Sequence, residues 1–359
     1  MSPTMSGWQT APRFSPVRCA MRVGQGRRRR GLARNGSPGG VTASFGRWPW
    51  RPSTLASRTG PAMAEGGVLI NSLPKSGTHL LERALELLGL RNWEATRPLV
   101  RRAGDRLGLT PPAFLDTRSA AAWRRARMCL PGADPRSAGG VPVGVFTPRS
   151  LDKAALARRL APRAPGSFVK AHIPYHPITA ELMTKAGLRS VTIIRDPRAV
   201  VASMVPFVLD AGGWRHFLQD RFAALCPEQR VDLVINGGET GRDGLTLLPL
   251  KQAIESVLDW DTHPGTLLVR FEDLVGPRGG GSAAAQSATL QAIADHLGCQ
   301  LTEDRRARMA GVFDTTAPTF RGGQVAGWRA RLTPDQANRV MAAIGPTLLA
   351  RAGYEAADG

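Results

Sequence analysis

Four short apolar segments constrain the fold of this chain more than any other feature. They are Val68–Leu73, Ser167–Ala171, Ser190–Arg195 and Thr266–Phe271. None shows the alternation of apolar and polar residues expected of a half-exposed strand, so each is typical of a strand buried on both faces. Because stretches with helical spacing separate them, the pattern predicts an α/β fold with three layers, in which helices cover both faces of a central, mostly parallel sheet.

Helix signals follow several of these strands. After the first strand, apolar residues recur at helical spacing up to Leu88, and Gly89 suits the end of that helix. Asp196 and Pro197 after the third strand are a typical helix cap and first helical residue. Near the end of the chain, Thr333 to Gln336 reads as a capping box that opens a helix toward Ile344.

Two long stretches, residues 91–165 and 210–248, interrupt this order. They are rich in Arg, Gly and Pro and are expected to be irregular, with short helical pieces such as Leu151–Leu160. Long loops on an α/β sheet often form lids or substrate pockets above the carboxyl ends of the strands. Because no internal repeat is present, residues 63–359 are interpreted as one domain with elaborated loops.

The charge of the chain is concentrated at its beginning. The formal net charge is +20, but residues 1–62 hold eleven arginines and no Asp, Glu or Lys, which leaves +9 for the rest. This first segment is rich in Gly, Pro and Ser and has no periodicity, so we expect a disordered basic extension. Met63 is a plausible alternative start. A moderately basic domain suits a polyanionic small molecule as well as a nucleic acid.

Cysteine and apolar content bear on the compartment. The four cysteines are far apart and form no CxxC pair, so a disulfide framework or a cysteine zinc site is not expected. The longest apolar stretch, Ala199 to Leu209, is too short to span a membrane and contains Pro206. No apolar signal-peptide region follows the basic start. We therefore expect a cytoplasmic protein without a transmembrane segment.

The first candidate site is the turn from Pro74 to His79, between the first strand and its helix. Such a turn presents free backbone N–H groups at the positive end of the helix dipole, where anions bind. Lys75 adds a positive charge, and the only glycine, Gly77, lets the backbone approach a ligand. The turn is not a Walker motif, which places its lysine directly after the second of two glycines. A surface turn without function is the alternative.

Two more candidates lie at strand ends. Arg195 ends the third strand, and Ser203 lies about two helical turns beyond it, so both can hold one phosphate. Lys170 and His172 end the second strand, where an α/β fold collects catalytic groups. His172 and His176 also suggest zinc, but Pro174 breaks the helix that such a pair needs, so we expect no metal there. A fourth segment, Thr319 to Trp328, is a flexible loop that bears Arg321.

Together the four segments resemble the sulfotransferase superfamily that uses 3′-phosphoadenosine 5′-phosphosulfate. The resemblance runs from about Gly66 to about Tyr354 and implies the family's P-loop NTPase-like fold. It implies that the first turn binds the 5′-phosphosulfate through Lys75, Ser76, Gly77, Thr78 and His79. It also implies that a C-terminal loop completes the cofactor site through Phe320, Arg321, Gly322 and Gly323. It further implies that Arg195 and Ser203 bind the 3′-phosphate. His172 corresponds to the family's general base, with Lys75 and Lys170 as catalytic cations.

The chain departs from the family pattern at three positions. Gly322 replaces a lysine of the C-terminal loop, Leu80 stands where a tryptophan often packs on the adenine, and His79 stands where a second threonine is common. The segment Arg270–Leu274 is similar to the family's fourth-strand ending. No sequence like the family's short dimerisation motif is present.

The resemblance implies transfer of a sulfuryl group to the hydroxyl or amine of a small molecule, glycan or lipid. A sulfuryl group carries less charge than a phosphoryl group, so no metal is expected. Two alternatives stay open at this point. A P-loop kinase or NTPase would use Asp196 to hold Mg²⁺, although the motif order argues against it. A basic nucleic-acid module is the other, although the chain has only two tyrosines and no aromatic stripe.

Overall fold

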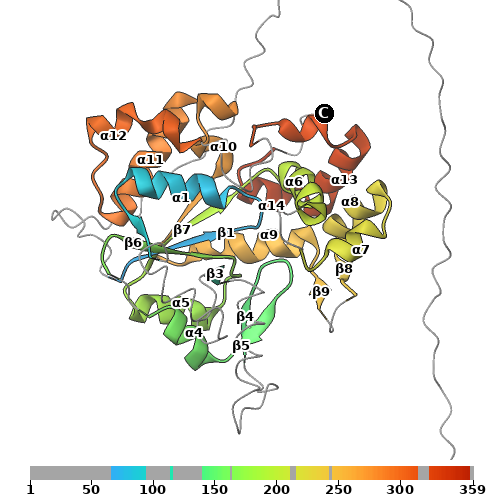
Figure 1. Ribbon diagram of the computed structural model, residues 1–359, viewed down its shortest axis with the longest axis horizontal. Coiled ribbons are helices and arrows are strands. Elements are labelled where there is room, and N and C mark those ends of the chain that lie inside the picture. The colour runs from blue at the N-terminus through green and yellow to red at the C-terminus, as the bar shows by residue number, and fades with distance from the viewer. Residues whose placement is uncertain are drawn as a thin grey trace, which may run out of the picture. The chain divides into compact units, whose positions relative to one another are not determined.

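The apolar segments pair into one parallel sheet (Figure 1). The strand order is β10-β7-β1-β6-β2, and β3 also pairs with β6. In the computed structural model the strands are β1 (Val68–Ser72), β2 (Arg91–Asn92), β3 (Phe114–Leu115), β6 (Ser167–Ala171), β7 (Arg189–Ile194) and β10 (Thr266–Arg270). All four expected strands form, each within one residue of its predicted ends.

The structure describes residues 66–93, 114–115, 140–161, 164–210, 216–241, 245–313 and 323–355. They all fall within one compact unit, Trp48–Gly359. The expected extension, residues 1–62, lies outside the described residues, as do most of residues 91–165. Two antiparallel hairpins stand apart from the main sheet, β4 (Val141–Val143) with β5 (Arg149–Leu151), and β8 (Gly238–Glu239) with β9 (Thr246–Leu247).

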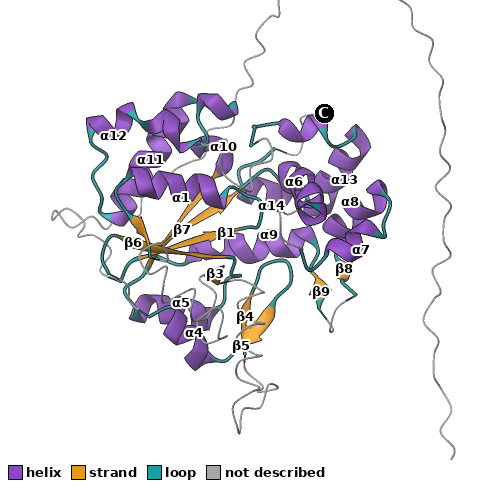
Figure 2. Cartoon of the chain, viewed as in Figure 1, coloured by secondary structure: helices purple, strands orange, loops and turns teal. Residues whose placement is uncertain are grey.

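Helices cover both faces of the sheet, which confirms the three-layer prediction (Figure 2). One face carries α1 (Thr78–Leu87), α10 (Phe271–Leu274), α11 (Ala283–Leu297) and, beside them, α12 (Glu303–Ala307). The other face carries α4 (Lys153–Arg159) and α5 (Pro177–Lys185). A third group consists of α6 (Pro197–Leu209), α7 (Gln219–Ala223), α8 (Pro227–Asn236), α9 (Leu250–Leu258), α13 (Pro334–Ile344) and α14 (Pro346–Arg351). Short 3₁₀ turns are Asp259–Thr262, Pro277–Gly279, Met309–Val312 and Gly327–Ala330.

Alternation along the central strand explains why both faces are covered. Val68 and Ile70 point into the core with α1 and α11, whereas Leu69, between them, packs with α4 and α5. Each of these three side chains is at most 2% exposed. A strand with apolar groups on both faces is stable only when helices cover both.

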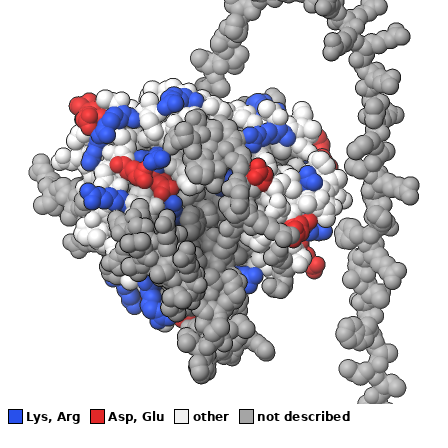
Figure 3. Space-filling model, in the orientation of Figure 1, with Lys and Arg blue, Asp and Glu red and all other residues white. Residues whose placement is uncertain are grey.

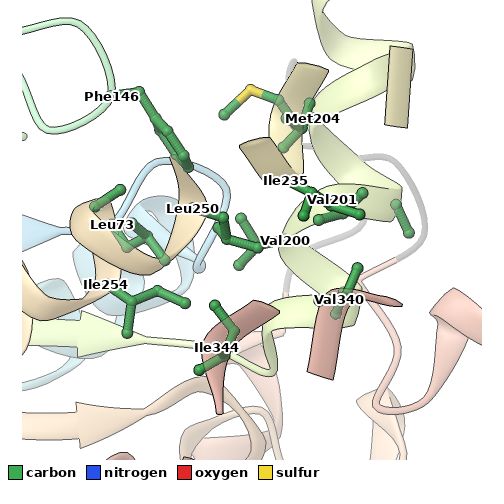
Figure 4. Packing of buried hydrophobic residues seen from close by; sticks show 14 of the residues in the cluster. Leu73, Phe146, Val200, Val201, Met204, Ile235, Leu250, Ile254, Val340 and Ile344 are labelled. Carbon is green, nitrogen blue, oxygen red and sulfur yellow. The ribbon is translucent and has the colours of Figure 1, made fainter. Parts of the chain in front are cut away.

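A third apolar cluster lies where β1 and β7 end. It begins with Leu73 and Ile194 and continues into helices α6, α9 and α13. Figure 4 shows Leu73, Val200 and Ile344 converging there. Because the residues at the ends of β1 and β7 pack into this cluster, the polar residues that follow the two strands are fixed relative to one another.

Both helix caps predicted from the sequence are confirmed. The Asp196 side chain accepts a hydrogen bond from the amide of Arg198 with Pro197 at the first helical position, and Thr333 and Gln336 form the capping box of α13. Residues 210–248 were expected to be irregular with short helical pieces, and the described part of this stretch contains the helices α7 and α8. Helix α8 was not predicted individually, although Val231, Val234 and Ile235 recur at helical spacing. These residues gain their burial from α6, α9 and α13.

The described surface carries mixed charge. On the face shown in Figure 3, basic side chains are spread over several elements and interspersed with acidic ones. Among the described residues, no helix has the length and apolar character needed to span a membrane.

Candidate functional site

The strand order reverses at β1, near the centre of the sheet. Strand β1 lies between β6 and β7, so the chain leaves β1 toward one side and later returns to its other side. In open α/β sheets, ligands bind outside the carboxyl ends of the strands where the order reverses in this way. The predicted site residues follow β1, β6 and β7, which are these three adjacent strands.

The turn after β1 has an unusual backbone. Lys75 has φ of 74° and Gly77 has φ of 101°, and only glycine adopts such angles without strain. A Cβ atom on Gly77 would lie 2.7 Å from Cδ2 of Phe271. Strained backbone of this kind is concentrated at ligand-binding turns.

The same turn contains polar groups available to a ligand. Gly77 caps α1 without a hydrogen bond from any side chain. The Ser76 hydroxyl is buried, and its oxygen has no hydrogen-bond partner among the residues that the structure describes. An unpaired buried hydroxyl costs about 1–3 kcal/mol, so the site is better satisfied with an anion present. Lys75 places its ammonium 3.7 Å from the centre of the Phe207 ring.

His172 is attached to the end of β1. Its Nδ1 lies 2.8 Å from the Ser72 carbonyl oxygen and 3.0 Å from the Ser72 hydroxyl. Since the carbonyl can only accept, Nδ1 carries the proton and the lone pair of the neutral ring is on Nε2. Burial, together with the positive charges of Lys75, His79 and Lys170, lowers the pKa of His172 to about 4, although the Ser72 bond opposes this shift. The imidazole is therefore neutral at physiological pH and able to accept a proton.

Asn71 holds the strand end that carries His172. The side-chain Nδ2 of Asn71 donates to the backbone carbonyl of Ile173 at 3.1 Å, and its Oδ1 accepts from the backbone N–H of Ile173 at 3.0 Å. Asn71 is fully buried, and the Ser72 hydroxyl next to it also contacts the Thr78 hydroxyl at 2.8 Å. Neither residue was predicted from the sequence, although two polar residues at the end of an apolar strand were a usable signal.

Glu82 on α1 contacts two of the predicted site residues, Lys170 and His79. Its two carboxylate oxygens accept from Lys170 at 3.0 and 3.1 Å, and one of them lies 3.1 Å from Nδ1 of His79. Burial raises the pKa of Glu82, but hydrogen bonds and charges from His79 and Lys170 outweigh it and hold the pKa at about 2. Asn92 donates to the same carboxylate at 2.9 Å. A glutamate on a helix surface gave no sequence signal for this role.

Arg195 stands directly after β7 and faces the first turn. Its guanidinium carbon lies 3.9 Å from the centre of the Phe271 ring, and it donates to the carbonyls of Gln324 at 3.1 Å and Lys75 at 3.5 Å. The Nε atom is buried and has no hydrogen-bond partner within the described part of the chain. Burial lowers the pKa of Arg195 and the charge of Glu272 opposes this, but an arginine remains a cation.

The first turn of α6 is capped by a side chain of the same junction. The Asp196 carboxylate accepts from the backbone N–H of Arg198 at 2.8 Å and pairs with the Arg198 guanidinium at 2.9 Å. The amide of Asp196 donates to Glu272 at 3.0 Å, and the Tyr354 hydroxyl donates to the same carboxylate at 2.8 Å. Burial raises the pKa of Glu272. Ser203 lies further along α6 and is half-buried.

The fourth predicted segment is described only from Gly323 onward; Phe320, Arg321 and Gly322 lie outside the described residues. Val325 donates from its amide to Gly279 at 2.8 Å, and Gln324 contacts Arg195. Contacts therefore connect the segments after β1, β6 and β7 and the C-terminal segment. Within the part of the chain that is described, no group of three or more His, Cys, Asp or Glu is arranged to hold a metal.

The chain is similar to known proteins in sequence and in fold. A family described as the sulfotransferase domain matches residues 65–351. A search of curated proteins finds no match. Among solved structures, mouse sulfotransferase SULT7A1 complexed with PAP is similar with 14% identity and a TM-score of 0.44, over 80% of this chain and 86% of that one. Retinol dehydratase in complex with androsterone and PAP is similar with 15% identity and a TM-score of 0.44, over 81% and 82%.

Proposed function

The chain belongs to the sulfotransferase family, and on that premise we propose how its residues transfer the sulfuryl group of 3′-phosphoadenosine 5′-phosphosulfate. Family membership decides between sulfuryl transfer and the phosphoryl transfer that the sequence left open. The donor has a phosphosulfate at its 5′ end and a phosphate at its 3′ end, so a site for it needs two separate anion-binding places.

One observation carries the proposal: the junctions after β1 and after β7 each contain a buried polar atom that has no hydrogen-bond partner among the described residues. These atoms are the Ser76 hydroxyl oxygen after β1 and the Arg195 Nε after β7. Buried polar groups are nearly always hydrogen-bonded in native proteins, so an unpaired one needs a partner. We assign the 5′-phosphosulfate to the turn of Lys75 to His79 and the 3′-phosphate to Arg195 and Ser203. The loop of Phe320 to Gly323 would complete the cofactor site.

The chemistry proposed for the first junction is an in-line displacement at sulfur. The acceptor oxygen or nitrogen forms a bond to sulfur while the bond from sulfur to the 5′-phosphate oxygen breaks. The acceptor's proton goes to Nε2 of His172, which is neutral because its pKa lies at about 4. Lys75 and the backbone N–H groups of the turn stabilise the charge that develops on the leaving phosphate. Lys170 supplies further positive charge and is held in place by Glu82.

The acceptor and the compartment are further parts of the proposal. We assign the acceptor to the hydroxyls or amines of small molecules, glycans or lipids, with no nucleic acid required. The aromatic side chain of Phe207, beside Lys75, supports an acceptor with some apolar surface. We also assign the enzyme to the cytoplasm. Cys226 and Cys299 are free thiols, as is usual in a reducing compartment.

Calorimetric titration with adenosine 3′,5′-bisphosphate, without metal, tests the proposal. We expect the protein to bind this ligand, and Arg195→Ala to weaken it about 10- to 100-fold, the effect of losing hydrogen bonds to a charged group. Adenosine 5′-phosphate, which lacks the 3′-phosphate, serves as the control ligand, because Arg195→Ala should leave its affinity nearly unchanged. Absence of bisphosphate binding, or binding of ATP that requires Mg²⁺, would contradict the proposal.

A further inference from the structure

A carboxylate, that of Glu82, lies close to a turn that otherwise favours negative charge. Glu82 follows Thr78, the first residue of α1, by four positions, so it is on the same helix face and about 6 Å further along the helix axis. The turn before Thr78 offers backbone N–H groups, the positive end of the helix dipole and the charge of Lys75. A negative charge one helical turn away weakens the binding of an anion at that turn.

The Glu82 carboxylate is held in one position by residues of three elements. Nζ of Lys170 on β6 donates to Oε1 at 3.0 Å and to Oε2 at 3.1 Å. Asn92 on β2 donates to Oε1 at 2.9 Å, and Nδ1 of His79 on α1 lies 3.1 Å from Oε2. The side chains of Glu82 and Lys170 are each only 14% exposed. The carboxylate therefore cannot turn away from an anion at the turn without breaking these contacts.

The stability of the fold gives no sufficient reason for this ion pair. Removing two charges from water costs free energy that their attraction often does not recover, so a largely buried pair is frequently no more stable than apolar side chains of the same size. Although burial raises the pKa of Glu82, the hydrogen bonds and charges of His79 and Lys170 hold it at about 2. At physiological pH the pair of Glu82 and Lys170 is therefore two fixed charges that sum to zero.

The charge of this pair bears on the group that the donor carries. Under the proposed function, Lys170 lies beside the sulfuryl group, which has one negative charge. A phosphoryl group in the same place has a similar tetrahedral shape but two negative charges at pH 8. At about 7–8 Å and an effective dielectric constant of about 20–80, the charge of Glu82 disfavours one additional negative charge about 3- to 30-fold.

We propose that Glu82 is a specificity-determining residue, which balances the charge of Lys170 so that the site accepts a monoanionic sulfuryl group and disfavours a dianionic phosphoryl group. This inference rests on the proposed function. It gives a physical reason, within the site itself, for the choice of sulfuryl transfer by a fold similar to that of P-loop NTPases.

Calorimetry on the full chain tests this role with two ligands that differ in their terminal group. Adenosine 3′-phosphate 5′-phosphosulfate and adenosine 3′-phosphate 5′-diphosphate are each titrated at pH 8 without metal. The variants are Glu82→Gln, which removes the charge, and Glu82→Asp, which keeps it. Glu86→Gln is the matched control, because Glu86 is an exposed residue of the same helix that pairs with Arg83 at 2.8 Å.

We expect the unchanged protein to bind the phosphosulfate more tightly than the diphosphate. Glu82→Gln should raise the affinity for the diphosphate, relative to that for the phosphosulfate, about 3- to 30-fold. Because the ratio of the two affinities is compared, a general loss of binding cancels. Glu82→Asp and Glu86→Gln should keep the original ratio within about twofold, since the first retains the charge and the second removes one that solvent screens.

The outcomes separate this inference from the function on which it rests. If the unchanged protein binds both ligands equally, if Glu82→Gln leaves the ratio unchanged, or if Glu86→Gln shifts it as much, the inference is wrong and the proposed function stands. If circular dichroism shows that Glu82→Gln does not fold, Glu82→Ser is the neutral variant for the same measurement. If the unchanged protein binds neither the phosphosulfate nor adenosine 3′,5′-bisphosphate, the proposed function itself fails.

Discussion

The strand-to-helix junctions after β1 and after β7 have similar local architecture but offer an anion different groups. After β1, the turn ends at Gly77, and no side chain of the described residues caps α1. After β7, the Asp196 carboxylate caps α6 and also pairs with the Arg198 guanidinium. Within the described part of the chain, the first helix start is therefore open, whereas the second is occupied by a carboxylate of the protein itself.

Under the proposed function, this difference fits the two ends of the donor. Backbone N–H groups and the helix dipole at the first junction would face the phosphosulfate, an arrangement suited to charge that develops during a reaction. At the second junction, the 3′-phosphate would be bound by side chains around the helix, which we assign to Arg195 and Ser203. We therefore expect changes at the first junction to affect turnover or the geometry of the turn, and changes at the second to affect affinity.

The largest expected effect is that of His172→Ala, because His172 is attached to the first junction through Ser72. Loss of a general base typically lowers turnover about 10²- to 10⁴-fold. Affinity for adenosine 3′,5′-bisphosphate should stay within about twofold, because His172 takes its proton from the acceptor and no phosphate-binding group is removed. Steady-state kinetics and calorimetry on the same preparation measure both quantities.

His176→Asn is the matched control for that variant. His176 caps α5 by accepting from the amide of Ile178, and asparagine is an equally good cap. The control should retain both turnover and affinity. If His172→Ala kept its turnover, the expectation that the first junction controls turnover would be wrong.

The next effect concerns the backbone of the open junction. Gly77→Ala introduces a side chain at φ of 101° and 2.7 Å from the Phe271 ring. We expect a loss of about 2–4 kcal/mol in the free energy of unfolding, from the backbone angle and from overpacking together. Gly280→Ala separates the two causes, because Gly280 is also left-handed, with φ of 83° and ψ of 11°, but the nearest atom to the added Cβ is at 3.6 Å, an ordinary contact distance.

Urea unfolding of both glycine variants gives the comparison. The Gly280→Ala change should cost only about 1–2 kcal/mol, the part that comes from the left-handed backbone conformation. Equal losses for the two variants would show that contact with Phe271 does not constrain the open turn.

The smallest effect near neutrality is the dependence of turnover on pH. The neutral form of His172 is the base, and its pKa of about 4 replaces the ordinary 6.5. The value of kcat/KM should therefore be level from pH 8 to about pH 5 and fall about tenfold per unit below pH 4. If the pH profile of kcat/KM instead had its midpoint near 6.5, the pKa of His172 would not be lowered at the first junction, which would contradict the structure.

The same shift affects stability in a defined direction. Between pH 4 and 6.5 the unfolded chain binds a proton at His172 that the folded chain does not, so stability rises with pH in this range. The contribution is lost as pH falls from 6.5 toward 4. Replacing His172 with Gln should flatten this part of the curve of unfolding free energy against pH.

Local patterns in the sequence were sufficient for the scaffold of the site. Four buried strands, the helix after the first, and the caps at Asp196 and Thr333 formed as expected. These features depend on residues within a few positions of one another, such as a carboxylate beside the free amides of its own helix. The turn with Lys75 and Gly77 belongs to the same class, because the positive φ of Gly77 suits a glycine directly before the helix.

Contacts between distant segments were beyond those patterns. Glu82 pairs with Lys170, 88 residues away, and Asn71 clamps Ile173, 102 residues away. Each depends on which strands become neighbours, and this is decided by burial of the whole apolar surface. The sequence by itself therefore determined the elements and the polar residues at their ends, while only the tertiary structure decided which of these residues meet, because pairing energy depends on three-dimensional proximity and not on spacing along the chain.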